Sequence, residues 1–306
     1  MSEILICIPT YNRNISLINC LKSIKRLKNE NFFKIRILVL DNSKKNDSYE
    51  IIKSFKKKQK LKIYQSHEKK RGIVYARNKC LQIAKKLNPN YIAFIDDDCE
   101  VDTNWLKNIF KLLNTTDADV ITGPQLYEGQ NSKNYTSLFE KRYKKKLLRV
   151  KWAASNNVFF KFDILKQEKN IKFDKNLNKF GMGEDQLFFS IINKIGYKIY
   201  WSKDIVVTEK KHTHRSNINW MKERSKRLGI LGHYLDIKIH GKIVGYFVNY
   251  IKCFYLLFTS IIIYINFFNV NKDLDFANYL FRFYGKLIGP FNIKKVQFFK
   301  QKNYLN

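Results

Sequence analysis

The chain has 306 residues and a formal net charge of +32, from 58 Lys and Arg against 26 Asp and Glu. A composition of 45% hydrophobic and 15% aromatic residues with 4 Pro predicts a globular protein with a folded core and excludes an extended disordered linker. The positive charge indicates an anionic partner, namely nucleic acid, an acidic membrane face or a phosphorylated substrate, with a compositional bias towards Lys as the alternative.

Apolar runs alternate with helical patterns over the first third of the chain. The runs predict strands at 4–8, 34–40, 61–64 and 91–95, separated by helices at 15–27, 48–58 and 72–87. This rhythm predicts an α/β fold, a mainly parallel, doubly wound sheet with right-handed crossovers. Ligands of such sheets bind at the carboxyl ends of the strands.

Three polar segments follow these strand ends directly: "PTYNR" (9–13), "DNS" (41–43) and "DDD" (96–98). If the chain stays extended after residue 95, Asp96 and Asp98 share one face while Asp97 points away. Two such carboxylates suit a hard cation, whereas the structural alternative is a turn or a helix cap. We therefore expect one pocket at this edge of the sheet.

The second part of the chain continues the pattern. A helix is expected at 105–113, a strand at 118–126 that runs into a Gly-Pro turn, and a strand with a short helix at 154–165. The basic, aromatic stretch 137–152 is either an acceptor-facing segment or a solvated helix face. The segment "FGMGED" (180–185) places Glu184 and Asp185 at a helix start.

The sequence lacks residues that several common metal-binding and nucleotide-binding motifs require. A calcium loop needs Gly where Val101 stands, and both the Walker phosphate loop and G-x-G-x-x-G are absent. A diphosphate would then be held by a metal on Asp98, with Arg71 or Arg77 nearby. The five cysteines show no paired metal spacing and predict reduced thiols, and residues 1–13 lack the features of a secretory signal.

The motifs "IPTYNR", "LDNS", "GIVYARN", "IDDD" and "GEDQLF" occur in that order, and together they resemble family 2 glycosyltransferases of GT-A fold over about residues 3–230. The resemblance implies a Rossmann-like, mainly parallel sheet flanked by helices and mostly inverting transfer from a nucleotide sugar, most often a UDP-sugar. It implies nucleotide contacts from Pro9, Thr10, Tyr11, Asp41, Arg77, Asp96 and Asp97. It also implies Mn²⁺ or Mg²⁺ on Asp98, and Asp185 as the catalytic base with Glu184 its neighbour.

Inverting sugar transfer itself calls for two such acidic groups. A carboxylate takes the proton of the attacking hydroxyl, and a cation stabilises the departing diphosphate. The structural alternative for "GED" is an N-terminal helix cap with a favourable dipole.

The segment 208–229 resembles a pattern of bacterial members of the family. Where many relatives have a metal-binding His, this register has Glu209, with His212 and His214 as rivals. Candidate contacts to the diphosphate or the acceptor are Arg215, Arg224, Arg227, Asn156 and Asn157. Their structural alternatives are a solvated basic helix for the arginines and strand-edge structure for the asparagines.

Composition changes after Gly241, and residues 253–271 contain no charged residue. We expect a GT-A domain at 1–235, with a nucleotide half at 1–125 and an acceptor half at 126–235, and a helical hydrophobic and basic appendage at 236–306. The uncharged stretch 253–271 has a length that suits membrane contact or a membrane span at the cytoplasmic face. A buried helix hairpin and a dimer surface are the alternatives.

The expected activity is metal-dependent sugar transfer from a nucleotide donor to a glycan or lipid-linked acceptor, at an anionic membrane surface and without nucleic acid. A basic nucleic-acid-binding protein is the alternative from another class, although acids at the strand ends oppose it. A sugar-nucleotide nucleotidyltransferase would need a Gly-rich loop where "PTYNR" stands. An inactive scaffolding relative is the third alternative.

Overall fold

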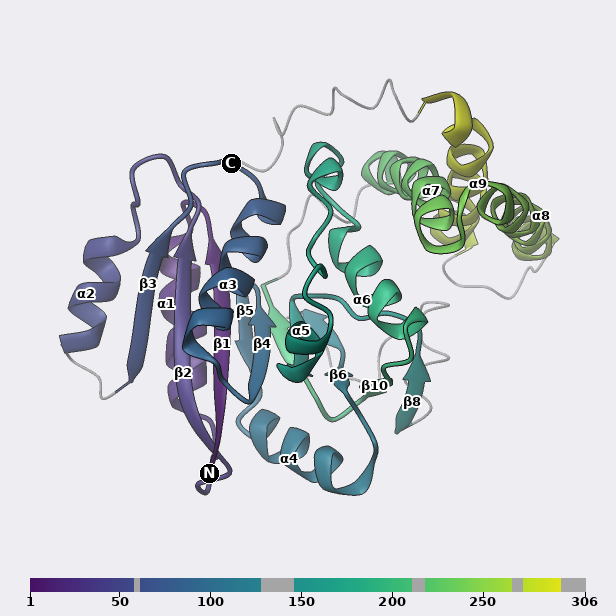
Figure 1. Cartoon of the computed structure of the whole chain (residues 1–306). Coiled ribbons are helices and arrows are strands. Elements are labelled where there is room, and N and C mark those ends of the chain that lie inside the picture. Colours follow the sequence, from purple (N-terminus) through teal and green to yellow (C-terminus); the bar gives the residue numbers. More distant parts are fainter. Residues whose placement is uncertain (58–60, 128–145, 211–217, 266–271, 293–306) are drawn as a thin grey trace. The chain divides into compact units, whose positions relative to one another are not determined.

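The computed structural model describes residues 1–57, 61–127, 146–210, 218–265 and 272–292 (Figure 1). The chain divides into two compact units. Of the described residues, the sheet unit comprises 1–57, 61–127, 146–178 and 184–210, and the helical unit comprises 179–183, 218–265 and 272–292.

Within the described residues, eight strands form the main sheet in the order β3-β2-β1-β4-β9-β6-β10-β8. Its strands are β1 Ser2–Thr10, β2 Phe33–Asp41, β3 Lys62–His67, β4 Tyr91–Ile95, β6 Val120–Thr122, β8 Leu147–Val150, β9 Asn157–Lys161 and β10 Ile199–Ser202. β1 to β4 are parallel, whereas β9 runs antiparallel to β4 and β6, and β8 antiparallel to β10. The predicted mainly parallel α/β sheet is confirmed.

Helices cover both faces of this sheet (Figure 1). They are α1 Asn14–Lys25, α2 Tyr49–Lys57, α3 Ile73–Leu87, α4 Trp105–Thr115, α5 Asp163–Gln167 and α6 Glu184–Lys194, with the 3₁₀ turn η3 at Lys175–Lys179. Alternate residues of β1 serve the two faces: Ile4 and Ile6 pack in the core with α1 and α4, and Leu5 in the core with α3 and α6. Each fully buried aliphatic side chain contributes about 1.5–3 kcal/mol, so both layers hold the strand ends in place.

A second, three-stranded sheet is built from short strands that alternate in the sequence with those of the main sheet. It consists of β5 Cys99–Val101, β11 Val207–Glu209 and β7 Gln125–Tyr127. Its central strand places Glu209 between Cys99 and Tyr127. This small sheet fixes the residues that immediately follow the acidic segment 96–98.

The helical unit contains α7 Ile218–His240, α8 Lys242–Ile265 and α9 Lys272–Asn292. α7 and α9 approach closely at Gly229 and Gly285. A Cβ on Gly285 would lie 2.1 Å from the Lys226 carbonyl oxygen, so only glycine fits at this contact. α7 runs without a break from Ile218 to His240 and belongs wholly to the helical unit.

Candidate active site

The carboxyl ends of β1, β2 and β4 lie side by side in the sheet and carry the three polar segments. Thr10 is the strand partner of Asp41, and β4, which ends at Ile95, is paired with β1. The parallel arrangement thus brings the segments at 9–13, 41–43 and 96–98 to one edge. This edge is the expected pocket position.

The acidic segment turns at once instead of staying extended. The Cys99 backbone N–H donates to the Asp96 carbonyl oxygen at 3.1 Å, which closes the turn. Asp97 points inward, where its carboxylate accepts a 2.7 Å hydrogen bond from the Thr10 hydroxyl. Arg13 Nη1 donates to Asp97 Oδ1 at 3.2 Å and to Asp98 Oδ2 at 2.6 Å. Asp97 and Asp98 therefore meet at the same guanidinium, whereas an extended backbone would turn Asp97 away from Asp98.

Asp96 pairs with a different arginine. Arg77 on α3 donates to Asp96 Oδ1 at 3.2 Å and makes a short ion pair with Glu184 at the start of α6. Burial raises the pKa of Asp96 above its ordinary value, with Arg77 opposing it. The buried Arg77 thereby joins the two acidic groups of the sequence, one after β4 and one at α6.

Burial dominates the electrostatics of Glu184 and Asp97. It raises the pKa of Glu184 to about 7, against the opposing charge of Arg77. It also raises the pKa of Asp97 to about 7, against that of Arg13. Glu184 Oε2 and Arg77 Nε are buried without a hydrogen-bond partner among the described residues. A polar ligand reaching this position would therefore find groups that lack a full set of partners.

Asp185 lies beside this pair in a more open position. It is half-buried, and its Oδ2 accepts hydrogen bonds from the Ser155 backbone N–H at 3.2 Å and the Ser155 hydroxyl at 3.4 Å. The backbone N–H of Gln186 donates to Oδ1 at 2.7 Å. These neutral donors orient an accessible carboxylate, as a general base requires.

Asp41 holds a turn after β2. Its two oxygens accept hydrogen bonds from the backbone N–H groups of Ser43 at 2.7 Å and Ser48 at 2.8 Å. Burial by itself would raise the pKa of Asp41, but the hydrogen bonds from Ser48 and Ser43 outweigh it and lower the pKa. Asp41 is thus an ionised, 2% exposed carboxylate.

A basic loop between β3 and α3 lies at the same edge. The Arg71 guanidinium sits 5.1 Å from the centre of the Tyr11 ring. Asn42 ties this loop down, since its side chain donates to the carbonyls of Glu68 and Lys70 and accepts from the Gly72 N–H. Arg71 and Tyr11 thus present a cation and an aromatic face beside the acids.

Asn157 makes its hydrogen bonds inside the protein. Its amide donates to the carbonyls of Pro124 and Ile205 and accepts from the Trp105 indole, and the residue is fully buried. These internal contacts favour a structural role for Asn157 at the strand edge over contact with an acceptor.

Asn156 belongs to a second chain of hydrogen bonds. It donates to Gln125, which donates to Glu209, a residue only 3% exposed. Glu209 therefore has an amide partner in the chain at the position expected for a metal ligand.

The other expected site residues lie in the helical unit or outside the residues that the structure describes. Arg224, whose guanidinium is 5.4 Å from the centre of the Trp220 ring, and Arg227 are both on α7. His212, His214 and Arg215 lie outside the described residues. In the part of the chain that is described, no three His, Cys, Asp or Glu side chains are placed to hold a metal together.

Sequence reasoning missed Arg13, Ser155 and Gln125. Arg13 was visible as the last residue of "IPTYNR", directly after a strand end. Ser155 and Gln125 carried no local signal, because their roles arise from contacts with Asp185 and Glu209, which are distant in the sequence.

The sequence model of Glycosyl transferase family 2 matches residues 5–173. The succinoglycan biosynthesis protein ExoM of Rhizobium meliloti is 25% identical over 239 residues, which cover 76% of this chain and 75% of that protein. The poly(ribitol-phosphate) beta-N-acetylglucosaminyltransferase TarP of Staphylococcus aureus is 24% identical over 230 residues, 72% of this chain and 67% of that protein.

Solved structures share the fold. The mannosyltransferase PcManGT from Pyrobaculum calidifontis, in complex with GDP-Man and Mn²⁺, superposes with a TM-score of 0.63 at 14% identity, covering 94% of this chain and 87% of that one. S. aureus TarS 1–349 with UDP-GlcNAc gives a TM-score of 0.52 at 16% identity, covering 97% and 93%. The GT-A-like architecture expected from the motifs is thereby confirmed.

Proposed function

The chain belongs to glycosyl transferase family 2, and from that premise we propose that this glycosyltransferase moves a sugar from a nucleotide donor, a UDP-sugar, onto a glycan or lipid-linked acceptor. The observation that carries the proposal is the junction of two acidic groups through Arg77, which bonds both Asp96 and Glu184. Relatives named for succinoglycan and poly(ribitol-phosphate) support surface-polysaccharide biosynthesis as the setting.

The donor nucleotide would occupy the edge formed by the ends of β1, β2 and β4. Pro9 and Thr10 end β1 there, Tyr11 follows directly, and the buried, ionised Asp41 supplies acceptor oxygens for a base. Arg71, stacked on Tyr11, and Arg77 supply positive charge for a diphosphate. Asp96, whose side chain is 35% exposed, is placed to accept hydrogen bonds from a ribose.

Asp98, with Asp96 nearby, would hold Mn²⁺ or Mg²⁺. Both ions prefer oxygen ligands and are often bound through one or two carboxylates plus substrate phosphates. One or two aspartates at this position are therefore sufficient protein ligands for either ion. Bound there, the ion would stabilise the negative charge of the departing nucleoside diphosphate. Glu209 is the less favoured ligand, since its carboxylate accepts a hydrogen bond from Gln125.

Asp185 would act as the base of an inverting transfer. Its carboxylate is half-buried and oriented by Ser155 and its own helix start, so an acceptor hydroxyl can approach it. Glu184 points away into the ion pair with Arg77 and would position α6. The attacking hydroxyl loses its proton to Asp185 as its oxygen bonds to the anomeric carbon and the bond to the diphosphate breaks.

Nucleotide binding tests this proposal most directly. Isothermal titration of the full chain with UDP, GDP, CDP and ADP, with and without Mn²⁺, should give Mn²⁺-dependent binding with a preference for UDP. Asp98→Asn should lose the Mn²⁺ dependence, while Arg26→Gln on the exposed surface should keep it. Full metal-dependent transfer by Asp98→Asn would contradict the metal role, and a folded chain that binds no nucleotide would contradict the donor pocket.

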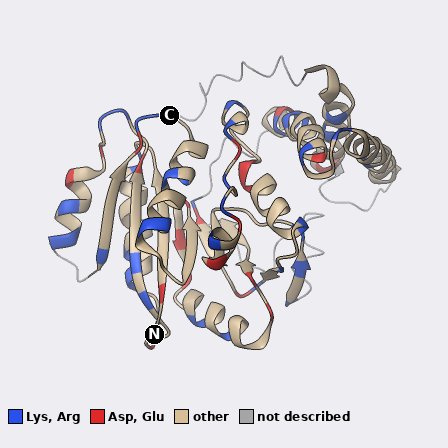
Figure 2. Cartoon of the chain, in the orientation of Figure 1, with Lys and Arg blue, Asp and Glu red and all other residues tan. Residues whose placement is uncertain are grey.

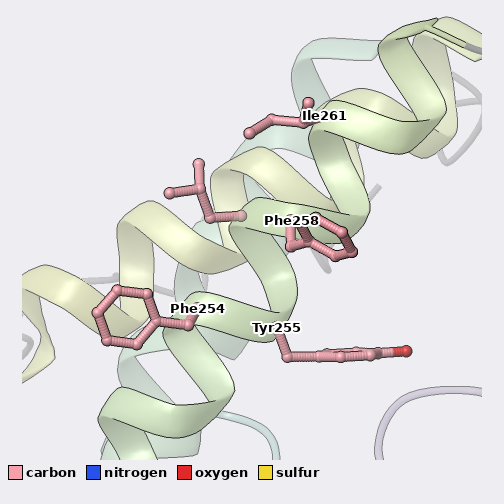
Figure 3. Close-up of a pocket in the computed structure, with 5 residues that line it drawn as sticks. Phe254, Tyr255, Phe258 and Ile261 are labelled. Atoms are coloured by element: carbon pink, nitrogen blue, oxygen red, sulfur yellow. The ribbon is translucent and has the colours of Figure 1, made fainter.

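We further propose that the helical unit rests on an acidic membrane surface, on the cytosolic side. Most of the inward residues of α8 are small or polar, and most of its large apolar residues face outward, the reverse of a soluble helix. The inward residues are Gly245, Asn249, Cys253, Leu256, Ser260 and Ile263. Figure 3 shows Phe254, Tyr255, Phe258 and Ile261, which lie on successive turns of α8 and line an open apolar pocket.

A further inference from the structure

Arg13 directly follows the loop after β1 and bonds to the carboxylate to which the metal is assigned. Its Nη1 lies 2.6 Å from Asp98 Oδ2 and 3.2 Å from Asp97 Oδ1. Asp98 is therefore already paired with a cation that belongs to the chain itself. Thr10 holds the other oxygen of Asp97 at 2.7 Å, so the carboxylates are fixed around the guanidinium.

The arginine compensates a strong local repulsion. Asp96, Asp97 and Asp98 are consecutive, and the side chains of Asp97 and Asp98 are only 6% and 16% exposed. Like charges this close oppose one another's ionisation, and an opposite charge within about 4–6 Å relieves that opposition. Arg77 serves Asp96, whereas Arg13 serves Asp97 and Asp98.

A guanidinium and a divalent ion bound at the same carboxylate repel each other, so they compete for Asp98. Mg²⁺ binds oxygen at about 2.0–2.1 Å, and its charge would repel an arginine held 2.6 Å from that atom. Arg13 is able to leave, because its side chain is 38% exposed and its carboxylate contacts are made by one nitrogen. Once released, it carries the planar donors that suit a diphosphate.

We propose that Arg13 is a placeholder cation that occupies Asp98 in the metal-free enzyme and yields this position when a divalent ion binds. It thereby weakens metal binding to the free enzyme and makes binding of the ion and of the nucleoside diphosphate favour each other. The proposal rests on the donor site proposed above. It adds a residue that sets metal affinity without serving as a ligand.

The test measures Mn²⁺ binding by the full chain through the free Mn²⁺ signal in electron paramagnetic resonance, without nucleotide and with saturating UDP. Arg13→Gln should bind Mn²⁺ alone about tenfold more tightly than the wild type, and the gain in Mn²⁺ affinity caused by UDP should shrink by a similar factor. Arg26→Gln is the matched control, because Arg26 pairs with the exposed Glu100 at 3.2 Å. It removes the same charge and should leave both affinities as in the wild type.

Unchanged or weaker Mn²⁺ binding by a folded Arg13→Gln would overturn the placeholder role and leave the donor site standing if UDP still binds. A folded wild-type chain that binds neither Mn²⁺ nor a nucleoside diphosphate would overturn both. A second measurement follows the wild-type protein and needs a variant at position 13, the conservative Arg13→Lys, only to assign the signal. In arginine-labelled wild-type protein, Mg²⁺ should shift the side-chain NMR signal of one slowly exchanging arginine, assigned with Arg13→Lys, and an unmoved Arg13 signal would contradict its release.

Discussion

Glu184 and Asp185 are neighbours in sequence but lie in different surroundings. Glu184 is 5% exposed and bonded to Arg77, whereas Asp185 is half-buried and accepts hydrogen bonds from Ser155 and Gln186. A base must reach the hydroxyl whose proton it takes. At the scale of the residue, this difference in exposure supports the proposed roles, with Asp185 as the proton acceptor and Glu184 as a group that positions α6.

Asp185→Asn should abolish most of the transfer activity. The amide keeps the size of the carboxylate but cannot take the proton, and general base catalysis is worth about 10²- to 10⁴-fold in rate. We expect kcat to fall by that factor while the affinity for UDP with Mn²⁺ stays nearly unchanged. Asp163→Asn, at an exposed position on α5, is the control. Wild-type turnover by Asp185→Asn would remove Asp185 from the chemistry.

The raised pKa of Glu184 predicts a pH dependence of stability. Because burial raises this pKa to about 7, the folded chain holds a proton on Glu184 at pH values where the unfolded chain has lost it. The stabilisation is complete below the ordinary carboxyl pKa and is lost as pH rises through about 7. Between pH 5 and pH 7.5, the Tm of the wild type should therefore fall relative to that of Glu184→Gln.

Thermal melts of both proteins across this pH range provide the measurement. Glu50→Gln on α2, where the side chain is 74% exposed, should track the wild type at every pH. A constant difference in Tm between the wild type and Glu184→Gln would show that Glu184 does not take up a proton on folding.

The sequence located the acids of the site but not their partners. Asp41, Asp96 and Asp185 were identifiable because each follows a strand end or begins a helix, which are local signals. The pairing of Arg13 with Asp98 depends on a turn that the extended-chain argument did not include. The internal hydrogen bonds of Asn157 depend on Trp105 and Ile205, whose positions follow from tertiary packing.

At the scale of the element, the start of α3 links the basic loop to the acids. Gly72 precedes the helix with φ +136°, a conformation that L side chains rarely adopt. Its N–H donates to Asn42, and a Cβ there would lie 1.8 Å from Asn178 Oδ1. α3 then carries Arg77 to both Asp96 and Glu184. The geometry at Gly72 therefore affects the loop and the helix together.

Gly72→Ala should weaken nucleotide binding as well as the fold. The strained φ costs about 1–3 kcal/mol, and the clash with Asn178 must shift either the loop or the helix. Gly196→Ala is a matched control, since Gly196 also has positive φ (+111°) but nothing within 4 Å of its would-be Cβ. Both variants should lower Tm, and only Gly72→Ala should weaken UDP binding in titration. Equal UDP affinities would contradict a link between this helix start and the site.

The order of the strands in the sheet could be predicted only in part from the sequence pattern of strands and helices. β1 to β4 were predictable because each is an apolar run followed by its own helix. The insertion of β9 antiparallel between β4 and β6 has no such signal, since it depends on pairing between residues 91–95 and 157–161 and between 120–122 and 158–160. The order of the second half of the sheet is therefore a property of long-range contacts.

At the scale of the whole molecule, charge and apolar surface have separate locations. Figure 2 shows Lys and Arg on many elements of the chain, while α8 is almost entirely uncharged. Among the described residues, α8 is long and apolar enough to cross a membrane by length and composition. In the helical unit, the buried Asp236 of α7 bonds Lys252 of α8 and the buried Lys286 of α9. These ion pairs link the three helices while the apolar side of α8 stays outward.

Replacing Phe254 and Phe258 by Glu should detach the chain from membranes. The two rings are 74% and 65% exposed, and burying each in a bilayer interface contributes about 1.5–3 kcal/mol. Sedimentation with vesicles that contain anionic lipid should show a loss of affinity on the order of 100-fold or more. Tyr49→Glu on α2, at a 45% exposed aromatic residue of the sheet unit, should bind like the wild type. Unchanged vesicle binding by the double variant, with loss of a dimer in analytical ultracentrifugation, would instead identify the face of α8 as a contact between copies of the chain.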